Sequence, residues 1–140
     1  HLEQLIMTAR VSHALSAYRM AASQVHPLVA VVRLFEDAAR RVGAAADLLE
    51  AKRFEEAYVH ITRVSLTLRG LARNLRDDLS GAEGKELAGL LKHTYITNLM
   101  ALHTAYGKKD APARYRRIRA GLWELRNAWA VVAGMPETAL

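Results

Sequence analysis

Three features of the sequence predict an all-α fold, an antiparallel up-down four-helix bundle with an additional N-terminal helical segment. Two stretches place apolar residues at alternating spacings of four and three: Ala57, Ile61, Val64, Leu68, Leu71 and Leu75, then Tyr115, Ile118, Leu122, Leu125, Trp129 and Val132. A residue every ~3.5 positions returns to one side of an α-helix, so each stretch forms a continuous apolar stripe. Two further runs have helical periodicity, and the connecting segments are short. Stripes of this length need partner helices, which a bundle supplies.

Length and composition indicate one folded domain. The chain has 140 residues, of which 51% are hydrophobic and 24% charged, as in ordinary soluble domains. No stretch reaches the ~20 apolar residues that a membrane helix needs. The sequence has no cysteine, which excludes a disulfide framework, thiolate metal sites and thiol catalysis. We expect a cytoplasmic protein.

Residues 1–22 and the helix that follows them differ in the strength of their apolar pattern. The apolar stripe of residues 1–22 is patchy, which predicts a helical segment that covers a groove of the bundle or packs as an extra bundle helix or dimer contact. Pro27 suits the first turn of the next helix. Gly43 within that helix indicates a close helix contact. Its inner side is predicted to carry Val31, Leu34, Phe35, Ala38, Val42, Ala45 and Leu49.

The second and third bundle helices are placed by a phase shift and by a capping motif. The apolar stripe changes phase near residues 51–53, so the second helix is predicted from Phe54 to about Leu79. Ser80 and Glu83 have the spacing of a capping box, which begins a helix. That third helix is predicted to run to about Lys108, with one side formed by Leu87, Leu91, Tyr95, Leu99, Leu102 and Tyr106.

The fourth bundle helix has signals at both ends. Asp110 and Pro112 suit its N-terminus, and Gly134 with Pro136 ends it after about Val132. The four-helix bundle therefore spans residues 23–134, and residues 135–140 form a tail. Trp123 lies beside the main stripe, which makes it a candidate for a second, partner-facing surface.

The sequence predicts no enzyme, metal site or cofactor. Di-iron bundles need two Glu-x-x-His motifs, and this chain has none. Glu56 and His60 are i,i+4 neighbours, but one such pair supplies only two ligands. Signatures of phosphate-binding loops, serine hydrolases, zinc peptidases and dinucleotide sites are also absent. No common ligand spacing relates the other histidines His13, His26, His93 and His103.

The chain carries a net charge of +6, from 20 Lys and Arg against 14 Asp and Glu. The densest basic patch consists of Arg114, Arg116, Arg117 and Arg119. A solvated basic face is the favoured interpretation, and we expect no nucleic-acid partner. One alternative is a basic helical module that binds nucleic acid through this patch, with an affinity that falls as salt rises. Another is a purely structural homodimeric bundle.

Motifs in order from about Tyr18 to Trp129 resemble those of flagellar export chaperones of the FliS type. The segment GLWELRNAW, residues 121–129, resembles the closing LLxxLRxAW helix of that family. GKELA at residues 84–88 is similar to GGEIA, and KKD at residues 108–110 matches KKD at the same spacing. Residues 26–38 resemble SP…LYDGA, and FEEA at residues 54–57 resembles YEEA. The third helix departs from the family, because apolar Ile96, Met100 and Tyr106 replace polar or charged positions.

The resemblance implies a cytosolic chaperone without a cofactor. Such a chaperone holds the disordered C-terminal segment of flagellin, prevents its premature polymerisation and delivers it to flagellar export apparatus components. A disordered apolar segment that folds onto a groove needs complementary apolar positions there. The predicted groove residues flank the main stripes, with Tyr18 as part of the N-terminal cover: Tyr18, Leu71, Ile96, Leu99, Met100 and Tyr106. The chaperone is expected to be a monomer or a homodimer.

Overall fold

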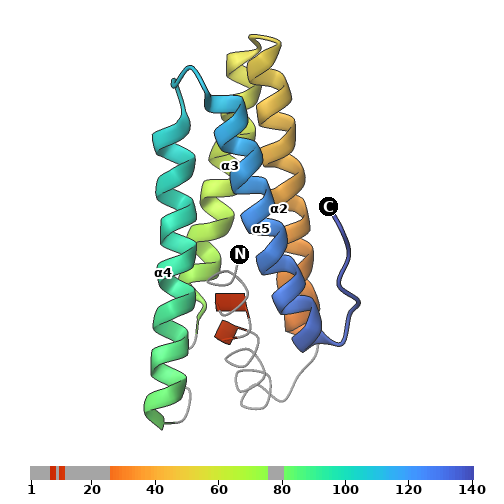
Figure 1. The fold of residues 1–140 in the computed structure, drawn as a ribbon, viewed down its shortest axis with the longest axis vertical. Coiled ribbons are helices and arrows are strands. Elements are labelled where there is room, and N and C mark those ends of the chain that lie inside the picture. Colours follow the sequence, from red (N-terminus) through yellow and green to blue (C-terminus); the bar gives the residue numbers. More distant parts are fainter. Residues whose placement is uncertain (1–6, 9, 12–25, 76–80) are drawn as a thin grey trace.

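The computed structural model describes residues 7–8, 10–11, 26–75 and 81–140. Its long helices are α2 (His26–Glu50), α3 (Phe54–Arg73), α4 (Gly81–Ala105) and α5 (Ala111–Ala133). Successive helices run in opposite directions, and their axes are roughly aligned (Figure 1). The described residues contain no strand. The predicted all-α up-down bundle is confirmed.

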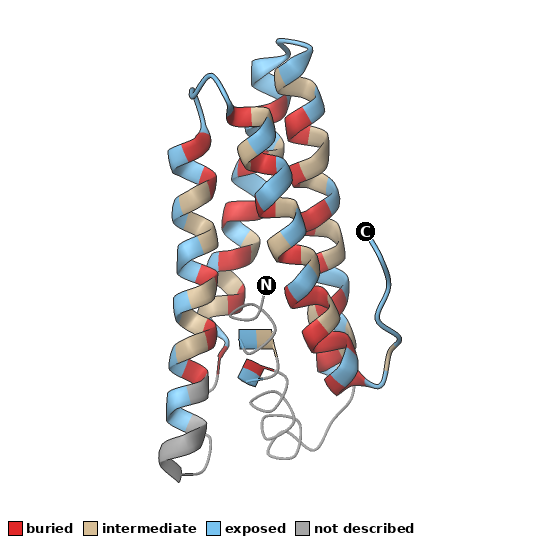
Figure 2. Ribbon diagram, in the orientation of Figure 1, coloured by how far each residue is buried: buried red, intermediate tan, exposed pale blue. Residues whose placement is uncertain are grey.

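The core lies where the two predicted stripes face the other helices. Every residue of both stripes is buried, with at most 8% of its surface exposed. Buried positions follow the inner sides of the helices (Figure 2). The largest enclosed side chains include Phe35 of α2, Tyr95 of α4 and Tyr115 of α5. Burial of such a side chain contributes about 1.5–3 kcal/mol, so these large residues stabilise the bundle.

The α2–α5 seam, the contact between these two helices, is closed by ion pairs at both ends. At one end Arg126, only 4% exposed, pairs with Glu36 at 2.9 Å. At the other end Arg116 pairs with Asp47 and Glu50. Between them, a Cβ atom on Gly43 would lie 3.2 Å from Cδ of Arg119. Gly43 therefore contacts the Arg119 side chain of α5 and lines a hollow beside it.

Helix α4 is attached through buried aromatic residues. The Trp129 indole N–H of α5 donates to the Tyr95 hydroxyl at 2.8 Å, and the Tyr115 hydroxyl donates to the Leu102 carbonyl oxygen at 2.7 Å. The Tyr95 ring also lies 5.6 Å from the ring of Phe35 on α2. These contacts satisfy the buried polar groups of large side chains, which would otherwise destabilise the core.

Two helix ends differ from the sequence prediction. Helix α3 ends at Arg73 rather than near Leu79, because Asn74 caps it through its backbone and through its side-chain amide, which donates to the Gly70 carbonyl oxygen at 2.9 Å. Helix α4 ends at Ala105 rather than near Lys108, because Gly107 adopts a φ of 84° that breaks the helix. The predicted capping box includes Ser80, which lies outside the described residues.

Two predictions about single residues of α2 and α5 are wrong in detail. Leu34 is 42% exposed, because it lies at the edge of the buried face of α2, whose centre follows Leu28, Val32, Phe35, Ala39 and Val42. Asp110 precedes α5 as predicted but makes no side-chain cap bond. Its carboxylate instead accepts a hydrogen bond from Arg114 Nε at 2.8 Å, since an arginine one turn ahead competes for it.

The C-terminal tail folds back along α5. Gly134 takes a left-handed conformation with φ of 75°, which ends the helix as predicted. Trp123 is half-buried, and its indole N–H donates to the Thr138 carbonyl oxygen at 2.7 Å. The Asn127 amide donates to the same oxygen at 2.9 Å. Trp123 therefore contacts the protein's own tail, because the turn at Gly134 directs the chain back over it, and it also lines a hollow over the α2–α5 seam.

Candidate binding groove

Two hollows lie between α4 and α5, one on each side of Asn98, and we call the pair the α4–α5 groove. The covered hollow, of about 320 Å³, lies against the N-terminal segment; its helical walls are His93, Thr94, Thr97 and Asn98 of α4 and Gly121, Glu124, Leu125 and Ala128 of α5. The open hollow, of about 440 Å³, is lined by Asn98, Met100, Ala101, Thr104 and Ala105 of α4 and Arg114, Arg117 and Ile118 of α5. Asn98 lines both hollows, so they meet at this residue.

The groove arises from small and self-satisfied side chains where α4 faces α5. A Cβ atom on Gly121 would lie 3.6 Å from Oδ1 of Asn98, so the helices are close at this point. The Asn98 amide donates to the Thr94 carbonyl oxygen at 2.9 Å, and the Thr94 hydroxyl donates to the Leu90 carbonyl oxygen at 3.0 Å. These α4 side chains bond to their own helix rather than to α5. The flanks of the contact consequently stay hollow.

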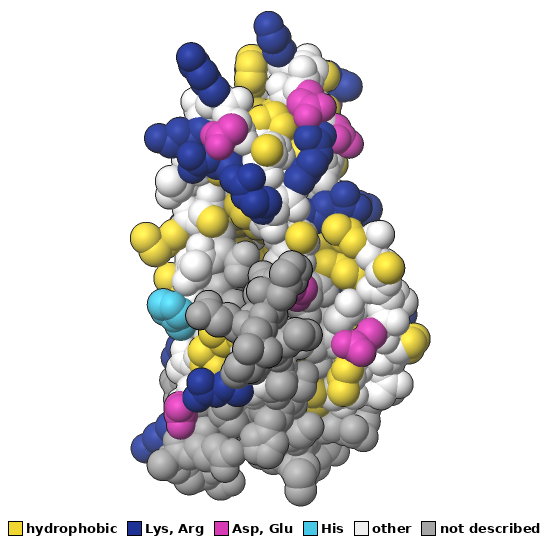
Figure 3. Space-filling view, in the orientation of Figure 1, with side chains coloured by type: hydrophobic (Ala, Val, Ile, Leu, Met, Phe, Trp, Pro, Cys, Tyr) yellow, Lys and Arg dark blue, Asp and Glu magenta, His cyan; other side chains and the backbone are white. Residues whose placement is uncertain are grey.

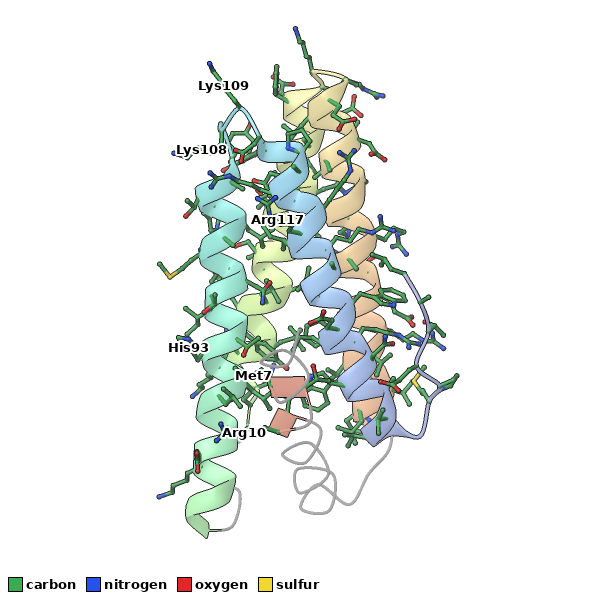
Figure 4. All side chains as sticks on the ribbon, in the orientation of Figure 1. Met7, Arg10, His93, Lys108, Lys109 and Arg117 are labelled. Atoms are coloured by element: carbon green, nitrogen blue, oxygen red, sulfur yellow. The ribbon has the colours of Figure 1, made fainter. Side chains whose placement is uncertain are left out.

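The described N-terminal residues cover one half of the groove. Val11 is 3% exposed and, with Met7 and Thr8, completes the wall of the covered hollow. Figure 4 shows Met7 and Arg10 near His93 of α4. The Arg10 guanidinium pairs with Glu86 at 3.2 Å, but both side chains are more than half exposed. Such a surface pair contributes only about 0–1 kcal/mol. Among these residues, burial of the Val11 side chain therefore contributes more to the attachment than the ion pair does.

The basic cluster of α5 divides between two sides of the helix. Arg114 and Arg117 line the open hollow, whereas Arg116 and Arg119 line a hollow over the α2–α5 seam. Hydrogen bonding from the Arg116 guanidinium lowers the pKa of the Glu50 carboxyl below its ordinary value. Lys and Arg side chains are prominent over the end of the bundle where the α4–α5 turn lies (Figure 3). The four arginines do not form one polyanion-binding surface.

The chain matches one known protein family over most of its length. The model of the family "Flagellar protein FliS" matches residues 11–136, which include helices α2 to α5. The chain belongs to the FliS family. FliS proteins are flagellar export chaperones rather than enzymes. Comparisons with curated proteins and with solved structures give no match.

The described part of this FliS protein contains neither a metal-binding cluster nor a membrane-spanning helix. No group of three or more His, Asp or Glu side chains there could hold a metal ion. Glu56 and His60, the i,i+4 pair considered as metal ligands, contact arginines instead: the Glu56 carboxylate pairs with Arg53, and the His60 ring contacts Arg41. Within the same residue ranges, no helix has the length and apolar character required to cross a bilayer.

The predicted groove residues of this FliS chain lie in different environments. Met100 is 64% exposed and lines the open hollow. Ile96 is 46% exposed on the outer side of α4, and Leu99 is half-buried against the core. Tyr106 is 38% exposed at the end of α4. Leu71 is buried in the core at 8% exposure, and Tyr18 lies outside the described residues.

Sequence reasoning missed most residues of the α4–α5 groove. The wall on α5 includes Gly121 and Ala128, which are seven positions apart beside the apolar stripe. Residues separated by seven positions share a helix face, so two small residues at this spacing could have predicted a shallow surface on α5. On α4, polar Thr97 and Asn98 give no such signal. Their place in the groove follows only from how α4 packs on α5.

Proposed function

We propose that this FliS protein binds the disordered C-terminal segment of flagellin in the α4–α5 groove and holds it in the cytoplasm until export. The bound segment cannot polymerise while its apolar positions are covered, and it is then passed to the export apparatus. The observation that carries this proposal is the seating of Val11, which is 3% exposed in a groove whose other half is open.

The groove has the shape and chemistry that an amphipathic client segment requires. Its two hollows lie end to end along α4 and α5 and meet at Asn98. A client that folds into a helix on binding presents apolar anchors at positions i, i+3, i+4 and i+7. Ile118 and Met100 supply apolar contacts in the open hollow, and Leu125 supplies one in the covered hollow. Met100 adapts well to different client side chains because its thioether is flexible.

We further propose that the N-terminal segment is a displaceable cover of the groove. Its described contacts are one buried valine and one exposed ion pair, which a larger apolar client can replace. Covering the groove also lowers the aggregation hazard of an exposed apolar surface when no client is bound. Tyr18 is proposed to belong to this cover. Ile96, Leu99 and Tyr106 are proposed client contacts outside the groove. Leu71 is buried, so it is proposed as a client contact only if a client side chain displaces its present core neighbours.

Calorimetric titration with the ~40-residue C-terminal peptide of the organism's own flagellin tests the proposal. We expect binding at micromolar or tighter dissociation constants, a negative heat-capacity change and little salt dependence, since apolar burial drives it. Steep salt dependence would instead favour a phosphate-contacting or other polar interaction. No binding at low or high salt would overturn the proposed client.

A matched pair of leucine substitutions locates the binding site. Gly121→Leu places a large side chain into the covered hollow, where even a Cβ atom reaches Asn98. Gly89→Leu adds the same side chain at an exposed position of α4 with no atom within 4 Å of the new Cβ. We expect the first substitution to weaken client binding by about tenfold or more and the second to leave it unchanged. Equal affinities would place the client elsewhere.

Deletion of residues 1–22 tests the cover separately. A displaceable cover competes with the client, so its removal should raise client affinity and lower the solubility of the free chaperone. Unchanged client affinity together with unchanged solubility would contradict a displaceable cover and favour a permanently packed N-terminal segment. Sedimentation of the same two proteins at several concentrations distinguishes monomer from homodimer.

A further inference from the structure

The end of the bundle opposite the N-terminal cover contains a hollow that the proposed flagellin groove does not use. We call it the end hollow; it has a volume of about 360 Å³ and lies where the α2–α3 and α4–α5 turns meet. Its apolar wall includes Phe54 and Tyr106, which are 53% and 38% exposed. Tyr106 stacks edge-on against Tyr58, with ring centroids 5.5 Å apart. Exposed aromatic side chains around a hollow are typical of interaction surfaces.

Three lysines rim the end hollow: Lys52, Lys108 and Lys109. Among the described residues, none of the three has an ion-pair partner. One carboxylate, Glu50, also lines the hollow, but it pairs with Arg116, and Asp110 beside Lys109 pairs with Arg114. Figure 4 shows Lys108 and Lys109 at the α4–α5 turn, away from the groove residues Met7 and His93. The rim is therefore positively charged and available to an acidic group.

The conformation of Lys52 is a second, independent observation at the same place. Lys52 has a φ of 60°, which makes it the sole non-glycine residue with positive φ in the described chain. The neighbouring α4–α5 turn uses Gly107, with φ of 84°, for the same purpose. A left-handed conformation is unfavourable for a residue with a Cβ atom. Lysine thus occupies a turn position that glycine would adopt at lower conformational cost. Backbone conformations of this unfavourable kind cluster at functional positions.

We propose that the end hollow docks an acidic peptide segment of a partner protein. An aliphatic or aromatic side chain of that segment fits between Phe54 and Tyr106, and flanking carboxylates pair with Lys52, Lys108 and Lys109. Charge complementarity selects this occupant, because a second copy of the chain would bring another lysine rim against the first. The apolar wall selects it over a nucleic acid, whose backbone would leave the hollow unfilled.

An NMR titration of the full chain tests this proposal with a defined probe. The probe is a capped synthetic peptide with a central Leu-Phe pair between two runs of three glutamates. We expect saturable amide shifts at residues 52–54 and 106–112 and binding that weakens as salt rises. A peptide with Ser-Ser in the centre should bind about tenfold more weakly, because it lacks the anchor. No saturable shifts, or equal binding of the serine peptide, would overturn the proposal.

Charge-reversal variants provide the matched control. The double substitution Lys108→Glu and Lys109→Glu should weaken binding about tenfold or more. Arg73→Glu with Lys85→Glu reverses the same number of exposed charges at the other end of the bundle and should leave binding within about twofold. Equal loss in both variants would overturn a local site. A poly-thymidine oligonucleotide that displaces the peptide at low concentration would make the surface a polyanion site instead and would also overturn the proposal.

Lys52→Gly separates the turn from its docking role. Relief of the left-handed lysine should raise the midpoint of thermal unfolding, while loss of its charge should weaken peptide binding severalfold. A raised midpoint with unchanged binding would remove Lys52 from the site. The Gly121→Leu variant should bind this probe normally, so failure here is distinguishable from failure of the flagellin proposal.

Discussion

Helix α5 makes two unlike contacts, one with α2 and one with α4. The α2–α5 seam carries ion pairs at both ends and a close approach at Gly43. The α4–α5 contact is made by the Trp129–Tyr95 and Tyr115–Leu102 hydrogen bonds, and beside it small or self-bonded side chains leave two hollows. One side of α5 is therefore closely packed, and the other borders the hollows in which we propose that the client binds. Substitutions on the two sides should have separable effects.

The largest effect is expected from the core side of α5. Leu122 is fully buried, and Leu122→Ala removes its packing and leaves a cavity. We expect a loss of about 2–5 kcal/mol in the free energy of unfolding, measured by urea denaturation. Leu66→Ala is the matched control, because Leu66 is 57% exposed on α3. That control should change stability by about 0.5 kcal/mol or less, and a similar loss in both variants would contradict this assignment of the core.

The seam itself is tested by Arg126→Met. Arg126 is 4% exposed, and its loss leaves Glu36 with only the exposed partner Arg33. We expect a loss of about 2–3 kcal/mol in unfolding free energy, below the usual value for a broken buried pair because Glu36 is 23% exposed. Arg33→Met removes the exposed partner and should cost about 1 kcal/mol or less. Equal costs would mean that burial of Arg126 adds nothing.

The same pair predicts the acid behaviour of the seam. Burial raises the pKa of Glu36, but hydrogen bonds from Arg33 and Arg126 outweigh it and leave that pKa below its ordinary value. A carboxyl with a lowered folded-state pKa stabilises the protein above its unfolded-state pKa of about 4.3, and this stability is lost as pH falls through the folded-state value. Arg126→Met should therefore flatten the decline in stability below about pH 4.3. If stability fell equally steeply below pH 4.3 in the variant and the original protein, Arg126 would not be what lowers the pKa of Glu36.

Attachment of α4 is tested at high pH through Tyr115. Burial of its ring, with a smaller contribution from Tyr106, raises the pKa of Tyr115 to about 12. The unfolded chain ionises first, near pH 10, so stability should fall by about 2–3 kcal/mol between pH 10 and 12. Tyr115→Phe should remove this decline, as measured by denaturation at each pH. The variant should also lose about 1 kcal/mol at neutral pH, because the bond to Leu102 is absent.

Sequence periodicity predicts the stable side of α5 well. The stripe from Tyr115 to Val132 is buried throughout, because one helix face against a core imposes a single repeat. On α2 the repeat is blurred by its many alanines, which fit at an interface as readily as on a half-exposed side, and Leu34 is misplaced for that reason. The contact of Trp123 with the tail arises because the turn at Gly134 brings the tail over it. No local pattern encodes that contact.

The groove side is harder to predict because its residues have no common chemical type. Thr97, Asn98, Gly121 and Ala128 are ordinary surface or spacer residues until α4 packs against α5. Met100 is the exception, since an exposed methionine on the outer flank of a helix is visible in the helical pattern. The groove's second wall could not be placed without the tertiary contact.

The smallest effect on stability, and the clearest separation of the two sides, is expected from Met100→Ser. Met100 is 64% exposed, so the substitution should change unfolding free energy by about 0.5 kcal/mol or less. It nonetheless removes an apolar contact from the open hollow, and affinity for the flagellin peptide should fall severalfold in calorimetry. Leu66→Ser is the matched control on α3, outside the groove, and should leave affinity unchanged. Equal affinities for the two variants would move the client off this side of α5, whereas a stability loss as large as that of Leu122→Ala would show that the groove residues also hold the bundle together.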